Sequence, residues 1–201
     1  MSKIVIDHNS DNERLRIGWI LDGKREEFAW FVNRYSQQVI DFTSRMLSNA
    51  EDAKEVAQDA FVKAFRQLSS FRGDSSFVTW VQRIAYHEAI DHLRQRVPYT
   101  VDISEVAAIS DDEDFSTGCD CNATLCPTVR EERILLMEET IDELPPDDQL
   151  LLHLYYYEDR PLRDIAYIMD AEPNALAQRL HRIRKRLLRM IKQKEDERTE
   201  R

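Results

Sequence analysis

Apolar residues recur at steps of three and four along most of the chain, which is the spacing that one face of an α-helix requires. In the first half this pattern predicts helices over residues 24–48, 51–68 and 77–96. The helix over 51–68 has a continuous apolar stripe, and we expect its opposite face to be acidic. The acidic positions of this prediction are Asp52, Glu55 and Asp59.

The periodicity stops between residues 98 and 126, where Asp, Glu, Ser and Thr predominate, so we expect a flexible acidic linker there. Helices are predicted again over residues 127–143, 146–157, 161–169 and 173–194, each with a proline near its start, where a missing N–H costs little. The fold class that follows is all-α, with two small helical domains joined by the linker. We place an N-terminal extension at 1–23, the first domain at 24–97, the linker at 98–132 and the second domain at 133–201.

The composition excludes several classes of protein. Only 4 of the 201 residues are glycine, which excludes a phosphate-binding glycine loop and disfavours a turn-rich β fold. No apolar run is long enough to cross a bilayer, and the first residues lack the order of a signal peptide, so we expect a cytoplasmic protein without membrane insertion. The three cysteines, all between residues 119 and 126, do not form a disulfide framework.

The net charge of −10 is unevenly distributed. Residues 1–97 are neutral overall, residues 98–132 carry a net charge of −8, and residues 133–201 carry −2. Within the last predicted helix, however, residues 176–194 include eight lysines or arginines and no acidic residue. One strongly basic helix is compatible with a nucleic-acid partner despite the acidic total. It also suggests the hypothesis that the acidic linker lies against this helix in the free protein and suppresses DNA binding.

The last two predicted helices have the layout of a helix-turn-helix, with a short helix, a turn and a longer basic helix. On a helical wheel Leu176, Leu180 and Ile183 mark an apolar face, and arginines occupy the adjacent face. Arginine pairs with guanine and glutamine with adenine in the major groove, so this helix is a candidate contact with duplex DNA. A solvated basic face is the alternative. The candidate residues are Ala175, Gln178, Arg179, Arg182 and Arg186.

A second candidate surface combines aromatic and basic side chains. The loop after the second predicted helix contains Phe71 and Arg72, and the next helix carries Phe77, Trp80 and Arg83. Proteins hold single-stranded DNA by stacking bases on aromatic rings and by neutralising phosphates with arginine. Packing in the hydrophobic core explains Phe77 and Trp80 equally well, and both interpretations stay open here.

Two groups of side chains in the sequence contain residue types that bind metal ions, a pair of histidines and a group of three cysteines. His87 and His92 lie about 140° apart around a helix, whereas the zinc-protease pattern needs histidines four residues apart, on one face. Cys119, Cys121 and Cys126 have no histidine nearby to complete a four-ligand zinc site, so exposed linker thiols are the favoured interpretation. The sequence contains no nucleophile–base constellation, and we predict no enzymatic activity.

The chain resembles bacterial extracytoplasmic-function (ECF) sigma factors in two regions, namely EDAKEVAQDAFVKAFRQLSSFRGDSSFVTWVQRIAYHEAIDHLRQR and the C-terminal helix-turn-helix. The resemblance covers about residues 24–97 and 133–193. It implies a promoter-specificity subunit that binds core RNA polymerase, directs it to promoter DNA and helps to open the duplex. Such a subunit has no active site or cofactor of its own.

The resemblance also implies residue roles. The acid-faced helix would bind the clamp helices of the polymerase through Asp52, Glu55, Gln58, Asp59, Phe61 and Val62. The following loop and helix would bind the melted non-template strand of the minus-ten element. The implied minus-ten contacts are Phe71, Arg72, Gly73, Asp74, Ser75, Trp80, Arg83, His87, Asp91 and Arg94, with His87 in place of the usual asparagine. The helix-turn-helix would bind the minus-thirty-five element as duplex.

The implied promoter elements are some 25 base pairs apart, roughly 85 Å. The segment 97–131 spans about 115 to 125 Å when extended but only about 30 to 35 Å when relaxed, so we expect the polymerase to hold the two domains apart. An anti-sigma partner is a further implication of the family. Two alternatives are a helix-turn-helix regulator that acts without polymerase and an enzyme.

Overall fold

The computed structural model describes residues 8–96 and 127–199, and within these ranges every regular element is helical, so the all-α prediction is confirmed. The first half contains α1 (His8–Leu21), η1 (Arg25–Glu27), α2 (Phe28–Ser44), α3 (Ala50–Arg66), η2 (Leu68–Ser70) and α4 (Phe77–Arg96). The second half contains α5 (Pro127–Asp142), α6 (Pro146–Leu152), the π-helical turn η4 (His153–Tyr157), α7 (Leu162–Met169) and α8 (Pro173–Thr199). Residues 98–126 of the predicted linker, with all three cysteines, lie outside the described residues, whereas residues 127–132, which the domain division assigned to the linker, form the start of α5.

An aromatic cluster forms the core of the first half. Phe31 of α2 and Phe77 of α4 have ring centroids only 4.3 Å apart, and neither residue is exposed. Phe28 meets Phe65 of α3 edge to face at 5.0 Å. Aromatic pairs at such distances add to the free energy gained by burial alone, so this cluster fixes how α2, α3 and α4 lie against one another.

Side-chain hydrogen bonds fix the start of α3 and its contact with α2. The Asn49 side chain accepts a hydrogen bond from the Glu51 N–H at 2.8 Å, which satisfies one of the free donors of the first turn. The buried Thr43 hydroxyl lies 2.8 Å from the carbonyl oxygen of Ala53 and so joins the end of α2 to α3.

The helix α1 packs against the first half although it precedes the predicted domain. Ile17 and Ile20 are buried against the core. The guanidinium of Arg16 lies 4.7 Å from the ring centroid of Trp30 and pairs with Glu27. Residues 1–23 were predicted only as an extension, so the packing of α1 against this core is a finding of the structure.

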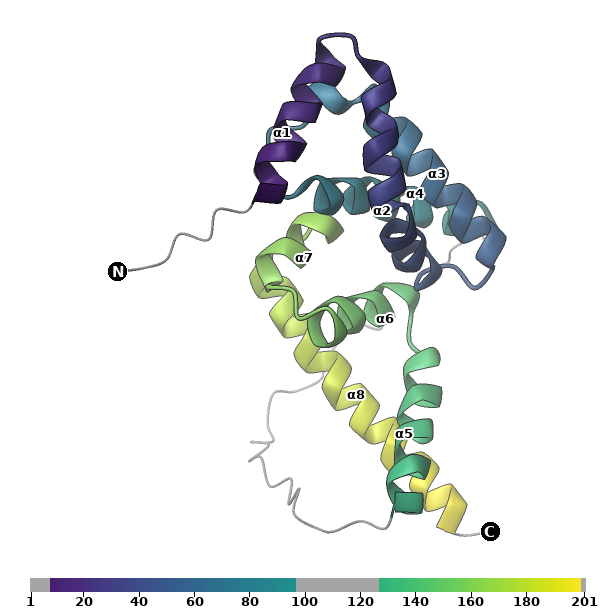
Figure 1. The fold of residues 1–201 in the computed structure, drawn as a ribbon. Coiled ribbons are helices and arrows are strands. Elements are labelled where there is room, and N and C mark those ends of the chain that lie inside the picture. The colour runs from purple at the N-terminus through teal and green to yellow at the C-terminus, as the bar shows by residue number, and fades with distance from the viewer. Residues whose placement is uncertain (1–7, 97–126, 200–201) are drawn as a thin grey trace.

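The second half is a small bundle from which α5 and the end of α8 project side by side (Figure 1). Its core contains Leu150, Leu154, Ile165 and Ile168, all unexposed. The α7 helix ends at Asp170, which adopts a left-handed conformation with φ 53° and forms the turn into α8. This short helix, turn and long helix confirm the predicted helix-turn-helix layout.

The two halves pack directly against each other, with α7 lying on α4 (Figure 1). Buried apolar residues from α1 to α8 form one continuous hydrophobic cluster. The halves also meet at a polar cavity of about 550 Å³ between the end of α2 and η4. Arg45, Asp41, His153 and Glu158 line this cavity.

His153 is the titratable group at this junction whose pKa is shifted. Burial lowers the pKa of His153, and the charge of Arg45 lowers it further; Glu158 raises it and Arg160 lowers it. The folded protein therefore prefers the neutral imidazole. The contribution of neutral His153 to the free energy of unfolding is fully present above the pKa of about 6.5 that the group has in the unfolded chain. It is lost as the pH falls through the lower pKa that the group has in the folded protein.

We therefore predict that His153→Gln reduces the loss of stability between about pH 7 and pH 5. Urea unfolding at several pH values measures this dependence. The control is His87→Gln, the same substitution at an exposed histidine outside this junction. Equal slopes for wild type and both variants would contradict the prediction.

Candidate functional site

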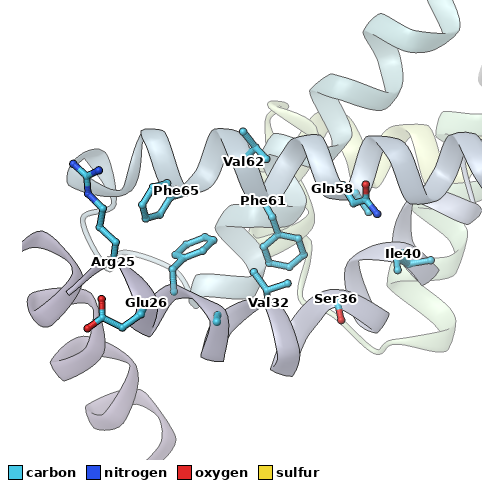
Figure 2. A pocket seen from close by; sticks show the side chains of 12 residues that line it. Arg25, Glu26, Val32, Ser36, Ile40, Gln58, Phe61, Val62 and Phe65 are labelled. Atoms are coloured by element: carbon cyan, nitrogen blue, oxygen red, sulfur yellow. The ribbon is translucent and has the colours of Figure 1, made fainter. Parts of the chain in front are cut away.

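An apolar groove of about 660 Å³ lies between α2 and α3 (Figure 2). Val32 and Ile40 line it from α2, while Phe61, Val62 and Phe65 line it from α3. Val62 is 47% exposed although its side chain is apolar. An exposed apolar residue beside a groove of this size is typical of a binding surface.

Polar and acidic side chains border the groove on α3. Gln58 lines the groove one turn before Val62, and Glu55 and Asp59 are exposed beside it. The predicted acidic face is therefore present at these positions. The contribution of α2 was missed by the sequence analysis, although Val32, Ser36 and Ile40 follow one another at four-residue steps and so share a face.

Asp52 does not lie on this exposed face, and that part of the prediction is wrong. The residue is 8% exposed, and its Oδ2 lies 3.6 Å from Nε2 of His92 on α4. Asp52 precedes the buried Val56 by four residues, about 40° around the helix, which places it at the edge of the apolar stripe. The contact of Asp52 with the polymerase remains a prediction, and the burial of this side chain does not support it.

The loop between η2 and α4 presents a short exposed segment. Gly73 adopts φ +76°, a conformation that side chains other than glycine rarely take, and Arg72 and Asp74 beside it are exposed. The loop ends at Ser76, whose hydroxyl accepts the Thr79 N–H at 3.2 Å and so caps α4. Ser75 is half-buried.

Aromatic packing holds this loop against α4. The ring of the half-buried Phe71 lies 5.1 Å from that of Trp80. Trp80 is itself buried and lies 5.9 Å from Phe77. Core packing therefore accounts for Phe77 and Trp80, while Arg72, Gly73 and Asp74 of the loop remain exposed.

The predicted contacts on α4 are not all free. His87, Asp91 and Arg94 are exposed, and Nη1 of Arg94 lies 3.6 Å from Oδ1 of Asp91 on the surface. Arg83, in contrast, donates a hydrogen bond of 2.6 Å to Asp170 at the end of α7. The sequence contains no signal for this pair, because its two residues are 87 positions apart.

The basic face of α8 is exposed at four of its five candidate positions, Ala175, Gln178, Arg182 and Arg186. Arg179 is different, since its Nε donates to Asp148 at 2.6 Å and its Nη2 lies 3.8 Å from Asp147, both on α6. Burial raises the pKa of Asp147, while the charge of Arg179 lowers it. In this structure Arg179 therefore joins α8 to α6, and its contact with DNA remains a prediction.

The two histidines considered as metal ligands lie in different surroundings, and the three cysteines are outside the described residues. His87 is exposed, whereas His92 faces Asp52 across to α3. Within residues 8–96 and 127–199 no group of three histidine, cysteine or carboxylate side chains is placed to hold a metal ion. In the same ranges no helix is long and apolar enough to cross a membrane.

The chain matches two family models in the expected order. Residues 31–97 match sigma-70 region 2, and residues 134–187 match sigma-70 region 4. It is 33% identical over 168 residues to the RNA polymerase sigma-H factor of Pseudomonas aeruginosa, covering 81% of this chain and 84% of that protein. The chain belongs to the ECF sigma factors. The ECF sigma-E factor of Escherichia coli K12 is also 33% identical, over 171 residues, with 81% of this chain and 85% of that protein covered.

Two solved structures support the same fold for this sigma factor. CnrH, solved in complex with the cytosolic domain of CnrY, has a TM-score of 0.57 at 18% identity and covers 89% of this chain and 96% of that one. The sigma factor RpoE of Bartonella quintana, solved with the anti-sigma factor NepR, has a TM-score of 0.56 at 19% identity, with coverage of 83% and 98%.

The function of this sigma factor follows from its family. It binds core RNA polymerase, directs the enzyme to specific promoters and promotes transcription initiation. The alternative, a helix-turn-helix regulator that acts without polymerase, is not favoured, because residues 31–97 match sigma-70 region 2. Sigma factors are initiation factors rather than enzymes.

We predict that Arg179→Ala destabilises the protein by about 1–2 kcal/mol, because it leaves two neighbouring carboxylates on α6 without their cation. Arg182→Ala, on the exposed side of the same helix, should change stability by less than about 0.5 kcal/mol. Urea unfolding of both variants at neutral pH checks this difference. Equal midpoints would show that Arg179 is as dispensable to the fold as Arg182.

Proposed function

We propose that the groove between α2 and α3 is where this sigma factor docks on core RNA polymerase. The supporting observation is the exposed apolar surface at Val62 next to the carboxylates of Glu55 and Asp59. A helix that carries basic and apolar residues complements such a surface in both charge and hydrophobicity. The clamp helices of the large polymerase subunit are the partner that the family implies. Phe61 and Gln58 form part of the same surface.

We further propose that the loop from Phe71 to Ser76 and the exposed side of α4 bind the melted non-template strand of the minus-ten element. Support comes from the exposed Arg72, Gly73 and Asp74 in a loop anchored by aromatic rings. A rigid loop next to a basic helix fits the capture of an unstacked base, because pocket contacts must offset the lost stacking. His87, Asp91 and Arg94 extend this surface along α4.

The exposed basic face of α8 is our proposed contact with the minus-thirty-five duplex. Gln178 and Arg182 stand near the start of the helix, where a recognition helix approaches base edges, and Arg186 follows one turn later. Arg179 supports this surface from behind through its ion pairs with α6.

An anti-sigma protein is a further proposed partner. Support comes from two solved structures with the same fold: the sigma factor RpoE is bound to the anti-sigma factor NepR, and CnrH is bound to the cytosolic domain of CnrY. The apolar groove is the surface we expect such a partner to cover, in competition with the polymerase. Because the polymerase is cytoplasmic, we place the action of this sigma factor in the cytoplasm.

We predict that Val62→Glu weakens binding to core polymerase by at least about tenfold, since it puts a charge into an apolar contact already bordered by carboxylates. Pull-down with core polymerase and run-off transcription from a mapped promoter measure the effect. The matched control is Leu15→Glu, because Leu15 is 60% exposed on α1 and lies outside the groove. Similar losses in the two variants would contradict the assignment of the groove.

We predict that Arg182→Ala weakens binding of the polymerase holoenzyme to its promoter by about 1–3 kcal/mol if the side chain contacts a base. Replacement of the base pair that it contacts should then cause no further loss in this variant. Gel-shift titration against salt separates the two kinds of contact, because a lost phosphate contact reduces the salt slope by about one. If the promoter affinity and the salt slope are both unchanged in Arg182→Ala, Arg182 does not contact the promoter DNA.

A further inference from the structure

We propose that Glu13 of α1 selects the base that the loop from Phe71 to Ser76 captures, by accepting a hydrogen bond from an exocyclic amine. Cytosine, adenine and guanine carry such an amine and thymine does not. Tyr35 of α2 is the positioning residue that holds the Glu13 carboxylate. The inference rests on the proposed function of the loop and extends it to α1. Sigma-70 region 2 matches the chain only from residue 31 onward, so the family model assigns α1 no role.

A cavity of about 500 Å³ lies between α1 and this loop. Its volume is within the range of pockets that hold small ligands. The aromatic residues Tyr35, Phe71 and Phe77 line it, and the ring centroids of Phe71 and Phe77 are 5.9 Å apart. Such an aromatic lining suits a planar base, because contact with rings replaces part of the stacking that the base loses when it leaves the strand.

The helix α1 contributes Glu13, Arg14 and Ile17 to the lining of this cavity. Ile17 is buried in the hydrophobic cluster that joins α1 to the rest of the first half. The ion pair between Arg16 and Glu27 fixes the same helix against the start of α2. Glu13 and Arg14 are therefore held beside the loop by packing on both sides of them in the sequence.

Two hydrogen bonds in series orient the Glu13 carboxylate. The Tyr35 hydroxyl donates to Oε1 of Glu13, and the Tyr35 oxygen accepts a hydrogen bond of 3.2 Å from Nε of Arg34. Burial and the hydrogen bond to Glu13 raise the pKa of Tyr35, so its hydroxyl keeps the proton that it donates. Among the described residues no donor contacts Oε2 of Glu13, which leaves that oxygen as an acceptor.

A carboxylate on a surface that binds DNA needs a specific reason, because it repels the phosphates of the strand. It becomes favourable where a base presents a donor, since carboxylates accept hydrogen bonds from the amine of cytosine. Thymine presents a carbonyl oxygen in the same place, and a carboxylate repels it. Arg14, exposed at the same cavity, supplies a positive charge next to Glu13 that offsets the repulsion of phosphates.

The other carboxylates that line the cavity are less suited to this role. Asp164 is on α7 and lies 3.3 Å from Nε of Arg163. Asp74 is exposed in the loop, and no hydrogen bond fixes its side chain within the part of the chain that the structure describes. Glu13 is half-buried and is oriented by Tyr35, so its acceptor has a defined position before DNA binds.

The test uses the polymerase holoenzyme and the non-template single strand of a mapped promoter. At each position of the minus-ten element a base with an amine is replaced by its amine-free counterpart: cytosine by uracil, adenine by purine and guanine by hypoxanthine. An abasic site at each position measures the dependence on a base as such. Fluorescence anisotropy gives the affinity of wild type, Glu13→Gln, Tyr35→Phe and the control Asp22→Asn, an exposed carboxylate outside this cavity.

We expect one position at which removal of the amine weakens wild-type binding by about tenfold or more, the effect of a hydrogen bond to a charged group. Glu13→Gln should abolish this difference, because an amide both accepts from an amine and donates to a carbonyl. Tyr35→Phe should reduce it, since only the hydroxyl that orients Glu13 is lost. Asp22→Asn should keep the wild-type difference. A purely structural role for Glu13 would lower the affinity for all strands alike.

The inference is overturned if wild type shows no amine dependence at any position, or if Glu13→Gln keeps that dependence in full, while abasic sites still weaken binding. A holoenzyme that fails to bind the strand, or binds it without dependence on any base of the element, would instead refute the proposed function of the loop and base selection with it.

Discussion

The packing of α2, α3 and α4 around the Phe31–Phe77 contact is the constraint on which the rest of the structure depends. The groove exists because α2 and α3 are held at a fixed separation, and the loop before α4 is held because Phe71 rests on Trp80 and Phe77. One core therefore supports both of the surfaces that we propose for region 2, the groove for the polymerase and the loop for DNA. Since protein interiors are close-packed, a change that shifts α4 displaces both surfaces.

The second half uses its charges in two different ways. Arg179 forms ion pairs with the carboxylates of α6, and these pairs hold α8 against α6. Arg182 and Arg186 project from the same helix into solvent and remain available to an anionic partner. The net charge of −10 is compatible with DNA binding because free positive charge is concentrated on one helical face.

Helical periodicity was sufficient to predict the α-helices from α2 onward, including Phe77–Arg96 without error, but α1 was not among the predicted helices. It did not predict the π-helical turn at His153–Tyr157, because an apolar and aromatic run is equally compatible with a regular helix. Asp52 and Arg179 were expected on exposed faces, and both differ for a common reason. Each polar side chain lies at a position that another helix covers in the folded chain. The ion pair between Arg83 and Asp170 could not be predicted from local pattern, since it depends on how the two halves dock.

Hydrogen–deuterium exchange of the full chain with and without core RNA polymerase tests the central claim most directly, because it reports which helices the polymerase covers. We predict slower exchange along α2 and α3 around the groove, together with faster exchange at the contact between α4 and α7 as the halves separate. Unchanged exchange along α2 and α3 in a complex that nevertheless forms would contradict the account.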